Sequence, residues 1–321
     1  MSLNTRLTEF LGVQHPILLA PMAMTSGGRL AAAVTAAGGL GLIGGGYGEA
    51  EWLQRQLEQA QGQRVGCGFI TWSLARNPEL LDLILAANPA AIMLSFGDPH
   101  KFAGPIHDAG IPLICQIHTR EQALRVLEVG PDIIVAQGSE SGGHGMSVRS
   151  TFTLVPDVVD LVAQRSAETL VVAAGGIADG RGLAAALALG ADGALVGTRF
   201  WACPEALVSP RAHQRAVEAS GDDTIRTRVY DIVRQRDWPA EYDLRLLSNS
   251  LIQAWHGNES ELIRRLPDLL GAFENAVAAE DFEMATVLVG EAVGLIRRVG
   301  PAADIVSEMV CDATRILNRS G

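Results

Sequence analysis

One histidine of this sequence lies in a glycine-rich loop directly after a short apolar run. The run at 133–136 ends at Gln137, and the segment Gly-Ser-Glu-Ser-Gly-Gly then leads to His144. Apolar runs with glycine-rich exits are typical of buried strands that lead into loops. Gly142 and Gly143 would let the backbone approach a ligand closely, although glycines also serve tight turns. A histidine held there can transfer a proton near neutral pH, so His144 is our candidate acid or base.

Other polar residues compete with this histidine or support it. His118 follows a different apolar run and is the second candidate, but it lies beside Thr119 at an expected helix start and would then only neighbour a cap. Glu140 would either orient His144 or neutralise its charge, or else be solvated, and the sequence leaves these open. The remaining histidines are expected to be structural or solvated: His15, His100, His107, His213 and His256.

Two further glycine-containing segments follow neighbouring apolar runs and predict a phosphate site. Ala-Gly-Gly-Ile-Ala-Asp-Gly leaves one run, and Val-Gly-Thr-Arg-Phe leaves the next. In barrels of alternating strands and helices, the loops after the last two strands often hold a phosphate through backbone N–H groups. We therefore expect Gly175, Gly176, Gly197 and Thr198 to bind a phosphate, although the glycines would also suit tight turns.

The remaining run exits predict a flat partner for the phosphate. Gln116 and Gln137 end two runs with amides that both donate and accept hydrogen bonds. Ala20, Pro21 and Met22 leave the first run and suit a flat apolar ring. Flavin mononucleotide (FMN) fits this set, and a sugar phosphate fits the phosphate site nearly as well. Three aromatic residues are expected to serve packing rather than the ligand: Phe69, Trp72 and Phe96.

Composition excludes several classes of function. The net charge of -11 argues against binding to nucleic acid or an anionic membrane, and hydrophobic content of 48% suits a large buried core. No secretory signal pattern and no run of about 18 apolar residues is present, so we expect a cytoplasmic protein. Three of the four cysteines lie in or beside apolar runs, and we expect buried reduced thiols.

The sequence also argues against several catalytic chemistries. Lys101 is the only lysine and lies in a polar segment, so Schiff-base and pyridoxal-phosphate chemistry is disfavoured. No histidine pair has metal-ligand spacing, and no carboxylate cluster appears, so no metal is expected. The serine-hydrolase elbow Gly-x-Ser-x-Gly is absent.

Eight short apolar runs, each followed by a helical pattern, must position these residues. Continuous apolar runs fit parallel strands that are covered on both faces. Eight such units predict an α/β fold, a (β/α)8 TIM barrel, with an open doubly wound sheet as the alternative. The runs are 16–20, 39–43, 64–70, 91–96, 112–117, 132–137, 169–174 and 192–196.

After the eighth run the pattern changes to helices and loops. We therefore expect a barrel at 1–202, a smaller helical insert at 203–283 and barrel-completing C-terminal helices at 284–321. The last barrel helix would lie within 285–299 or within 302–317.

Taken together, these motifs resemble the nitronate monooxygenase family, formerly called 2-nitropropane dioxygenases. The likeness covers about 16–200 and resumes at 289–296, which looks like the start of the family's C-terminal helix. The motifs that carry it are Ala-Pro-Met (20–22), Ala-Ala-Gly-Gly-Leu-Gly-Leu-Ile (36–43), Gln-Gly-Ser-Glu-Ser-Gly-Gly-His (137–144), Ala-Gly-Gly-Ile-Ala-Asp-Gly (174–180) and Val-Gly-Thr-Arg-Phe (196–200).

The resemblance implies an FMN enzyme without a metal that oxidises alkyl nitronates with dioxygen to carbonyl compounds and nitrite. His144 matches the catalytic histidine, which would be the base for neutral nitroalkanes and would bind or polarise the nitronate. Many members have Gly-Val-Asn on the third strand, where this chain has Gly-Cys-Gly ending at Gly68. The implied FMN-binding residues are Ala20, Pro21, Met22, Gly68, Gln116, Gln137, Gly142, Gly143, Gly175, Gly176, Gly197 and Thr198.

Two other functions stay open at this point. Related flavin barrels include NAD(P)H-dependent enoyl-acyl-carrier-protein reductases and quinone reductases, and fold likeness does not decide the reaction. A nucleotide patch for NAD(P)H would draw on insert arginines such as Arg226, Arg228 and Arg234. The second alternative is a non-catalytic binder of flavin or of a phosphate metabolite. The expected partners are a nitronate and dioxygen, and a homo-oligomer is left open.

Overall fold

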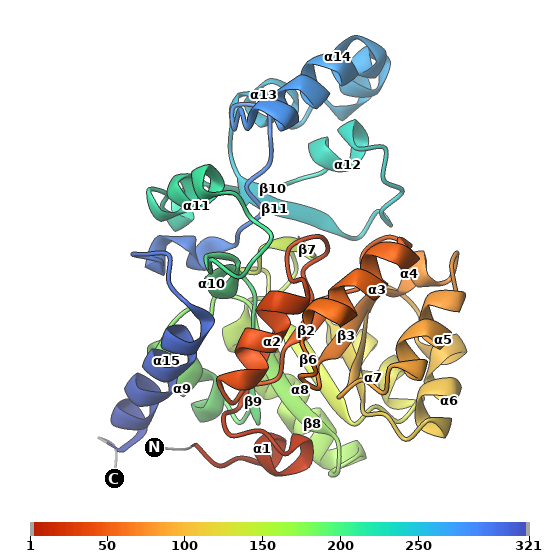
Figure 1. Cartoon of the computed structure of the whole chain (residues 1–321), viewed down its shortest axis with the longest axis vertical. Coiled ribbons are helices and arrows are strands. Elements are labelled where there is room, and N and C mark those ends of the chain that lie inside the picture. Colours follow the sequence, from red (N-terminus) through yellow and green to blue (C-terminus); the bar gives the residue numbers. More distant parts are fainter. Residues whose placement is uncertain (1–2, 319–321) are drawn as a thin grey trace.

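The computed structural model describes residues 3–318, and its main body is a nearly closed barrel of eight parallel strands surrounded by helices (Figure 1). The barrel strands are β1 (Ile17–Leu19), β2 (Leu42–Gly44), β3 (Gly66–Ile70), β4 (Ile92–Ser95), β5 (Leu113–Ile117), β6 (Ile133–Gln137), β8 (Leu170–Ala174) and β9 (Gly193–Val196). Their order is β1-β9-β8-β6-β5-β4-β3-β2, and a parallel bridge between Leu18 and Leu40 brings β1 beside the chain that enters β2. The predicted TIM barrel is confirmed, and the open sheet is wrong.

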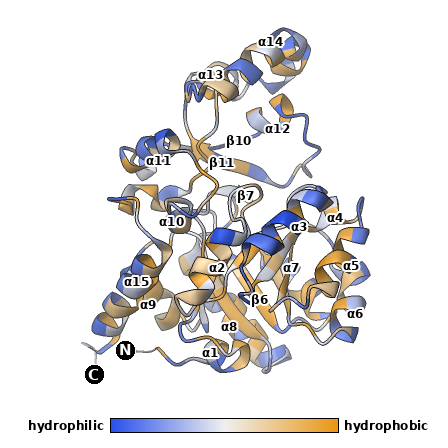
Figure 2. Cartoon of the chain, viewed as in Figure 1, coloured by the Kyte–Doolittle hydropathy of each residue, from blue (hydrophilic) through white to orange (hydrophobic). Residues whose placement is uncertain are grey.

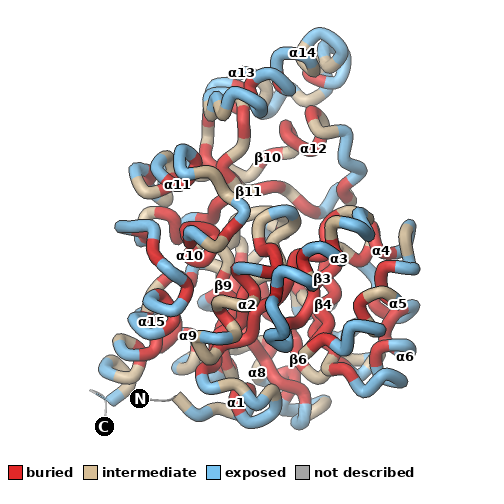
Figure 3. The backbone as a smooth tube through the Cα atoms, in the orientation of Figure 1, coloured by how far each residue is buried: buried red, intermediate tan, exposed pale blue. Residues whose placement is uncertain are grey.

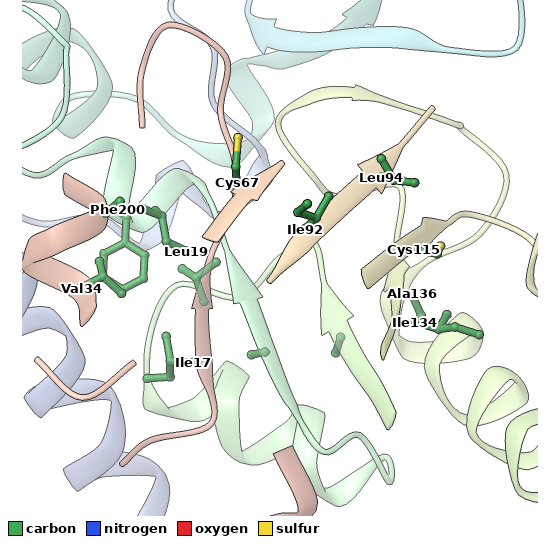
Figure 4. Close-up of a cluster of buried hydrophobic side chains, with 14 of the residues drawn as sticks. Ile17, Leu19, Val34, Cys67, Ile92, Leu94, Cys115, Ile134, Ala136 and Phe200 are labelled. Atoms are coloured by element: carbon green, nitrogen blue, oxygen red, sulfur yellow. The ribbon is translucent and has the colours of Figure 1, made fainter. Parts of the chain in front are cut away.

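The barrel strands are apolar on both faces because each face packs against a different layer. Successive side chains of a strand point to opposite faces. In β1, Leu18 packs in the barrel interior with residues of other strands, whereas Ile17 and Leu19 pack toward the outer helices. Figure 4 shows this outer layer, with Val34 and Phe200 beside the β1 side chains. The thiols predicted to be buried and reduced are free and lie in this layer: Cys67, Cys115 and Cys203.

The outer layer of the barrel consists of amphipathic helices. Figure 2 shows hydrophobic residues along the strands and hydrophilic residues on the outer surfaces of helices such as α3 and α15. The helices around the barrel are α1 (Arg6–Leu11), α2 (Gly28–Ala36), α3 (Ala50–Gln59), α4 (Thr71–Leu74), α5 (Glu79–Ala86), α6 (His100–Asp108), α7 (Arg120–Leu127), α8 (Thr151–Arg165), α9 (Gly180–Ala188), α10 (Thr198–Trp201) and α15 (Ala302–Leu317). None of the helices within residues 3–318 is long and apolar enough to cross a membrane.

The last barrel helix is α15, which packs against α9 and α2. The other candidate region, 285–299, contains only the short 3-10 helix η2 (Glu291–Leu295). The resemblance to the family motif had implied that the segment 289–296 begins a C-terminal helix. This expectation is wrong, because the C-terminal helix α15 begins at Ala302. The small residues Gly290 and Gly294 of the segment 289–296 instead pack directly against the backbone near 142 and 221.

The insert lies over the carboxyl ends of the barrel strands, and it is not wholly helical (Figure 1). Its elements are α11 (Pro210–Val217), η1 (Gly221–Asp223), β10 (Thr224–Thr227), α12 (Val229–Val233), β11 (Asp243–Leu247), α13 (Ser250–Trp255) and α14 (Glu259–Ala279). Strands β10 and β11 are antiparallel, and β11 also pairs with β7 (Gly143–Gly145). The expectation of a helical insert is wrong at these two strands. In β11, the polar-apolar alternation of Asp-Leu-Arg-Leu forms a strand with Leu244 and Leu246 buried.

The strand pairing attaches the insert to the histidine loop. Leu244 of β11 is the register partner of His144 in β7. Figure 3 shows buried chain in this junction and exposed chain on the distal helices α13 and α14. The division into barrel, insert and C-terminal segment remains a proposal. Its end residues 1–2 and 319–321 lie outside the described residues.

Candidate active site

A cavity of about 450 Å³ lies between the carboxyl ends of the barrel strands and the insert. In TIM barrels this end of the strands carries the active site. Every residue that the sequence assigned to the catalytic or cofactor site lines this one cavity: Ala20, Pro21, Met22, Gly68, Gln116, Gln137, Gly142, Gly143, His144, Gly175, Gly176, Gly197 and Thr198. Residues as far apart in the chain as positions 20 and 198 thus converge because the strand ends meet at one rim.

The exits of β8 and β9 form a wall made of backbone. Gly175 and Gly176 have φ values of 100° and 74°, a region that side chains disfavour. Within residues 3–318, the N–H groups of Gly176 and Gly197 donate to no backbone carbonyl. The Thr198 hydroxyl accepts from the Gly290 N–H at 2.9 Å, which leaves its own proton to donate. This wall can therefore present several hydrogen-bond donors to an anion.

The N-terminus of α9 contributes less to this wall than its position implies. The carboxylate of Asp179 accepts from the backbone N–H groups of Arg181 and Gly182 at 2.9 and 3.2 Å. It therefore caps the helix itself. The anion-binding capacity of this rim lies in the glycine backbone before the helix.

Gly68, where many family members have Asn, lies directly under Pro21. A Cβ atom built on Gly68 would be 2.3 Å from Pro21 Cγ, far inside contact distance. The Pro21 ring thus occupies the space where a side chain at position 68 would begin. Where an Asn at position 68 would place its amide, this chain therefore has the apolar ring of Pro21 at the cavity wall.

The two glutamines are held against His118 behind the cavity wall. Gln137 Nε2 lies 3.3 Å from His118 Nε2 and donates to the His144 carbonyl at 3.0 Å. Gln116 Nε2 lies 3.5 Å from the same His118 nitrogen. Burial lowers the pKa of His118 to about 3, so its ring is neutral and accepts from these amides. The second base candidate therefore supports the glutamines and does not line the cavity.

The His144 ring is held by two contacts. Its Nε2 atom lies 2.8 Å from Asp231 Oδ1, and its ring stacks on Trp238 with centroids 3.4 Å apart and planes 8° apart. Its other ring nitrogen, Nδ1, has no hydrogen-bond partner among residues 3–318 and is not enclosed. Burial lowers the pKa of His144, and the Asp231 carboxylate opposes that change. The ring is thus a neutral imidazole at the cavity wall, with Nε2 held by Asp231 and Nδ1 without a hydrogen-bond partner among residues 3–318.

Glu140 makes no hydrogen bond to His144 in the described part of the chain, and its carboxylate is held by Thr151. Both of its oxygens accept from the Thr151 N–H at 3.0 Å, and Oε2 also accepts from the Thr151 hydroxyl at 3.1 Å. The carboxylate therefore fixes the start of α8 to the loop. The residue that contacts the imidazole is Asp231, which lies 87 positions further along the chain.

Arg226 of β10 fixes the loop that carries the histidine. Its guanidinium donates to the carbonyls of Ser139, Ser141, Gly145 and Asp243 at 2.8 to 3.2 Å. Burial lowers the pKa of Arg226 to about 10, with Arg245 as a further cause. A planar five-donor group suits several carbonyls at fixed angles. The insert therefore sets the conformation of the loop through one side chain.

Sequence reasoning missed most of the insert's contribution to the cavity. Asp231, Arg234 and Trp238 line it, and Tyr47 joins them through a contact of 3.3 Å with Trp238 Nε1. The alternation at 243–247 was a signal for the strand that brings them close, but no motif marked the residues themselves. Phe69 packs in the core and Phe96 packs on Trp238 and Tyr242, and both also line the cavity. Within residues 3–318 no cluster of three potential metal ligands occurs.

Comparison with known proteins places this geometry in a family. The nitronate monooxygenase family matches residues 4–64 and 71–312, so the unmatched stretch 65–70 contains Gly68. The nitronate monooxygenase npaC of Metarhizium robertsii is 33% identical, over 94% of this chain and 91% of that protein. FabK from Thermotoga maritima superposes with a TM-score of 0.85 at 31% identity, covering 99% and 98% of the two chains. A nitroalkane oxidase from Streptomyces ansochromogenes has a TM-score of 0.82 with 99% and 100% coverage, and at 24% identity it supports the fold alone.

Proposed function

The chain belongs to the nitronate monooxygenase family and is an oxidoreductase, and we propose that it oxidises alkyl nitronates with dioxygen to a carbonyl compound and nitrite, using FMN. One observation carries this proposal. His144, whose Nδ1 atom has no hydrogen-bond partner among residues 3–318, lines the same cavity as the glycine wall at the exits of β8 and β9. A proton carrier and an anion-binding backbone are thus brought to one space.

The residues of the cavity fit FMN. Gly175, Gly176, Gly197 and Thr198 would hold the phosphate, because their backbone is approachable and two of their N–H groups have no backbone partner within residues 3–318. When bound, FMN supplies the electron acceptor of the oxidation and the route to dioxygen. The residues that would line the ring are Ala20, Pro21, Met22, Gly68, Gln116, Gln137, Gly142 and Gly143.

His144 would handle the proton of a neutral nitroalkane, whose carbon acid must ionise before it is oxidised. The nitronate itself needs no such step, and the cavity offers its negative charge a cation. Arg234 lines the cavity near Asp231 and His144, and its guanidinium donates a hydrogen bond to the Thr286 hydroxyl. Arg234 is half-buried and has no carboxylate partner among residues 3–318, and such a guanidinium favours an anionic substrate.

The purified protein tests the cofactor and the reaction separately. We expect visible flavin absorbance that survives dialysis, or uptake of added FMN by the apoprotein. With FMN bound, we expect oxygen consumption and nitrite formation from the nitronates of small nitroalkanes. A colourless protein that takes up no FMN would refute the cofactor, and a flavoprotein inert toward nitronates would refute the reaction.

An NAD(P)H-dependent FMN reductase is the second candidate, and the superposition with FabK favours it. Rapid anaerobic bleaching of the flavin by NADH or NADPH, with nitronates inert, would select this alternative. The insert arginines provide little support, since Arg226 is bonded to loop carbonyls and Arg228 donates to the Trp238 carbonyl at 3.2 Å. A non-catalytic binder has no need of an open imidazole in its cavity.

A further inference from the structure

We propose that Asp231 is a positioning residue that keeps the proton of the neutral His144 ring on Nε2, so that Nδ1 is the base of the reaction. This inference rests on the proposed function. Asp231 comes from α12 of the insert, and the histidine comes from the loop after β6, so the pair exists only when insert and barrel are joined.

The contact itself selects one tautomer. The Asp231 side chain is 4% exposed and the His144 side chain is 8% exposed, and 2.8 Å separates Oδ1 from Nε2. A carboxylate only accepts hydrogen bonds, so Nε2 must carry the proton and Nδ1 must present the lone pair. The tautomer of a histidine is set by the hydrogen bond that its other nitrogen makes.

No other hydrogen bond competes for this carboxylate within residues 3–318. Its second oxygen, Oδ2, is buried without a partner, which is costly and therefore calls for an explanation. The backbone of α12 is fixed independently, since the Arg236 N–H donates to the Asp231 carbonyl at 2.8 Å. The side chain is thus free of a structural bond other than the one to the imidazole.

The surrounding charges make the carboxylate necessary once the ring is protonated. Arg234 and Arg226 are the cations that face His144, and both oppose a positive imidazole, as does burial. Trp238 covers one face of the ring and keeps the plane fixed, but it is uncharged. Asp231 is therefore the group that compensates an imidazolium in this site.

The proton step is balanced within these groups. Nδ1 takes the proton from the α-carbon of the nitroalkane, and the electron pair of the broken C–H bond moves onto the nitro group to give the nitronate. The ring becomes an imidazolium paired with the Asp231 carboxylate, and the proton later leaves to water. A preformed nitronate bypasses this step, which provides an internal control.

The test is Asp231→Asn in the FMN-loaded protein, with a neutral nitroalkane and its preformed nitronate compared at one pH. An asparagine presents either a carbonyl or an amide N–H to Nε2, so it no longer dictates the tautomer. We expect kcat/KM for the nitroalkane to fall by about 10²-fold or more, with a loss of less than about tenfold for the nitronate. Asp237→Asn is the matched control, because that carboxylate lies on the same segment and its side chain is 81% exposed.

A second measurement reads the tautomer without any turnover. In protein labelled with ¹⁵N-histidine, the His144 signals are assigned by their loss in His144→Asn. We expect an Nε2-protonated neutral ring in the wild type and a shifted tautomer ratio in Asp231→Asn. A wild-type ring protonated on Nδ1 would overturn the inference, even if the protein proved to be a reductase and nitronates were inert.

A double variant separates positioning from a general structural role. If Asp231 acts through the imidazole, then adding Asp231→Asn to His144→Asn should leave the nitroalkane rate unchanged. Equal losses with nitroalkane and nitronate, or additive losses in the double variant, would assign Asp231 to the scaffold and overturn the inference.

Discussion

The cavity has two walls that are built from different material. The wall at the exits of β8 and β9 is backbone, and within residues 3–318 the N–H groups of Gly176 and Gly197 donate to no backbone carbonyl. The other wall is made of side chains from the insert, chiefly Asp231, Arg234 and Trp238. The barrel wall suits a constant ligand such as a phosphate, whereas the insert wall carries the charges and rings that act on a substrate.

This difference predicts that the two walls fail in different ways. A change on the barrel wall should alter the affinity for the cofactor and leave proton transfer in the loaded protein intact. A change on the insert side, or in the loop it holds, should alter turnover and leave cofactor affinity intact. A substitution in one wall should therefore leave the property that depends on the other wall unchanged.

The largest effect is expected for His144→Asn. The amide cannot take a proton from carbon, so kcat/KM for neutral nitroalkanes should fall by about 10² to 10⁴-fold. The affinity for FMN, measured by flavin titration, should change little, because the glycines beside the histidine are retained. His107→Asn on the exposed face of α6 is the matched control. An unchanged rate would remove the imidazole from the mechanism.

Gly197→Ala should produce the next largest effect, and on the opposite property. An added Cβ would lie 3.5 Å from Ala20 Cβ and 3.7 Å from Met22 Sδ, so the protein accommodates a methyl group. A phosphate that approaches this backbone would not, and we expect FMN affinity to fall by about 10- to 100-fold, or about 1.4 to 2.8 kcal/mol. Thermal stability of the apoprotein should be retained.

Gly104→Ala is the control for this prediction, since a Cβ there meets no atom within 4 Å. At saturating FMN, the nitroalkane rate of Gly197→Ala should approach that of the wild type. A variant with normal FMN affinity would mean that the β9 exit does not contact the cofactor. A variant with normal affinity and a lost rate would break the division between the walls.

The contrast between the walls also explains what the sequence could predict. The barrel and its lining follow from local patterns, because a buried parallel strand and its glycine exit are contiguous in the chain. Ala-Gly-Gly and Val-Gly-Thr therefore located the backbone wall correctly. Gly142 was identified as well, although it also packs against the Gly290 backbone, where a Cβ would lie 2.4 Å from nitrogen.

The partners of His144 could not be predicted in the same way. Asp231 becomes its neighbour only through the pairing of β11 with β7, a contact between segments about 100 residues apart. Glu140 was the nearest carboxylate in sequence, yet its oxygens are bonded to Thr151. A strand of five residues in a region of mostly helical patterns gave too weak a pattern to fix that pairing.

Arg226→Lys should have a smaller effect, confined to the loop. A lysine keeps the charge but cannot donate to four carbonyls at the angles of a guanidinium. We expect unfolding to become easier by about 2 kcal/mol and the nitroalkane rate to fall by about tenfold, as His144 loses its fixed position. Denaturant titration and steady-state kinetics measure the two effects. A rate loss with no change in stability would contradict this explanation.

His118→Gln should have the smallest effect at neutral pH and a distinct one in acid. The pKa of His118 is about 3 in the folded protein, below the ordinary value of 6.5, so the unfolded chain binds the extra proton first. Stability should therefore fall as pH drops from about 6.5 toward 3. Glutamine keeps an acceptor for Gln137 and does not titrate. Between about pH 7.5 and pH 5, urea titrations should show the wild type losing roughly 2 kcal/mol more of its free energy of unfolding than the variant.

His107→Gln, at an exposed site, should retain the wild-type pH dependence. If His118→Gln retains it too, the buried imidazole is not held neutral, and its role as the acceptor behind the two glutamines fails.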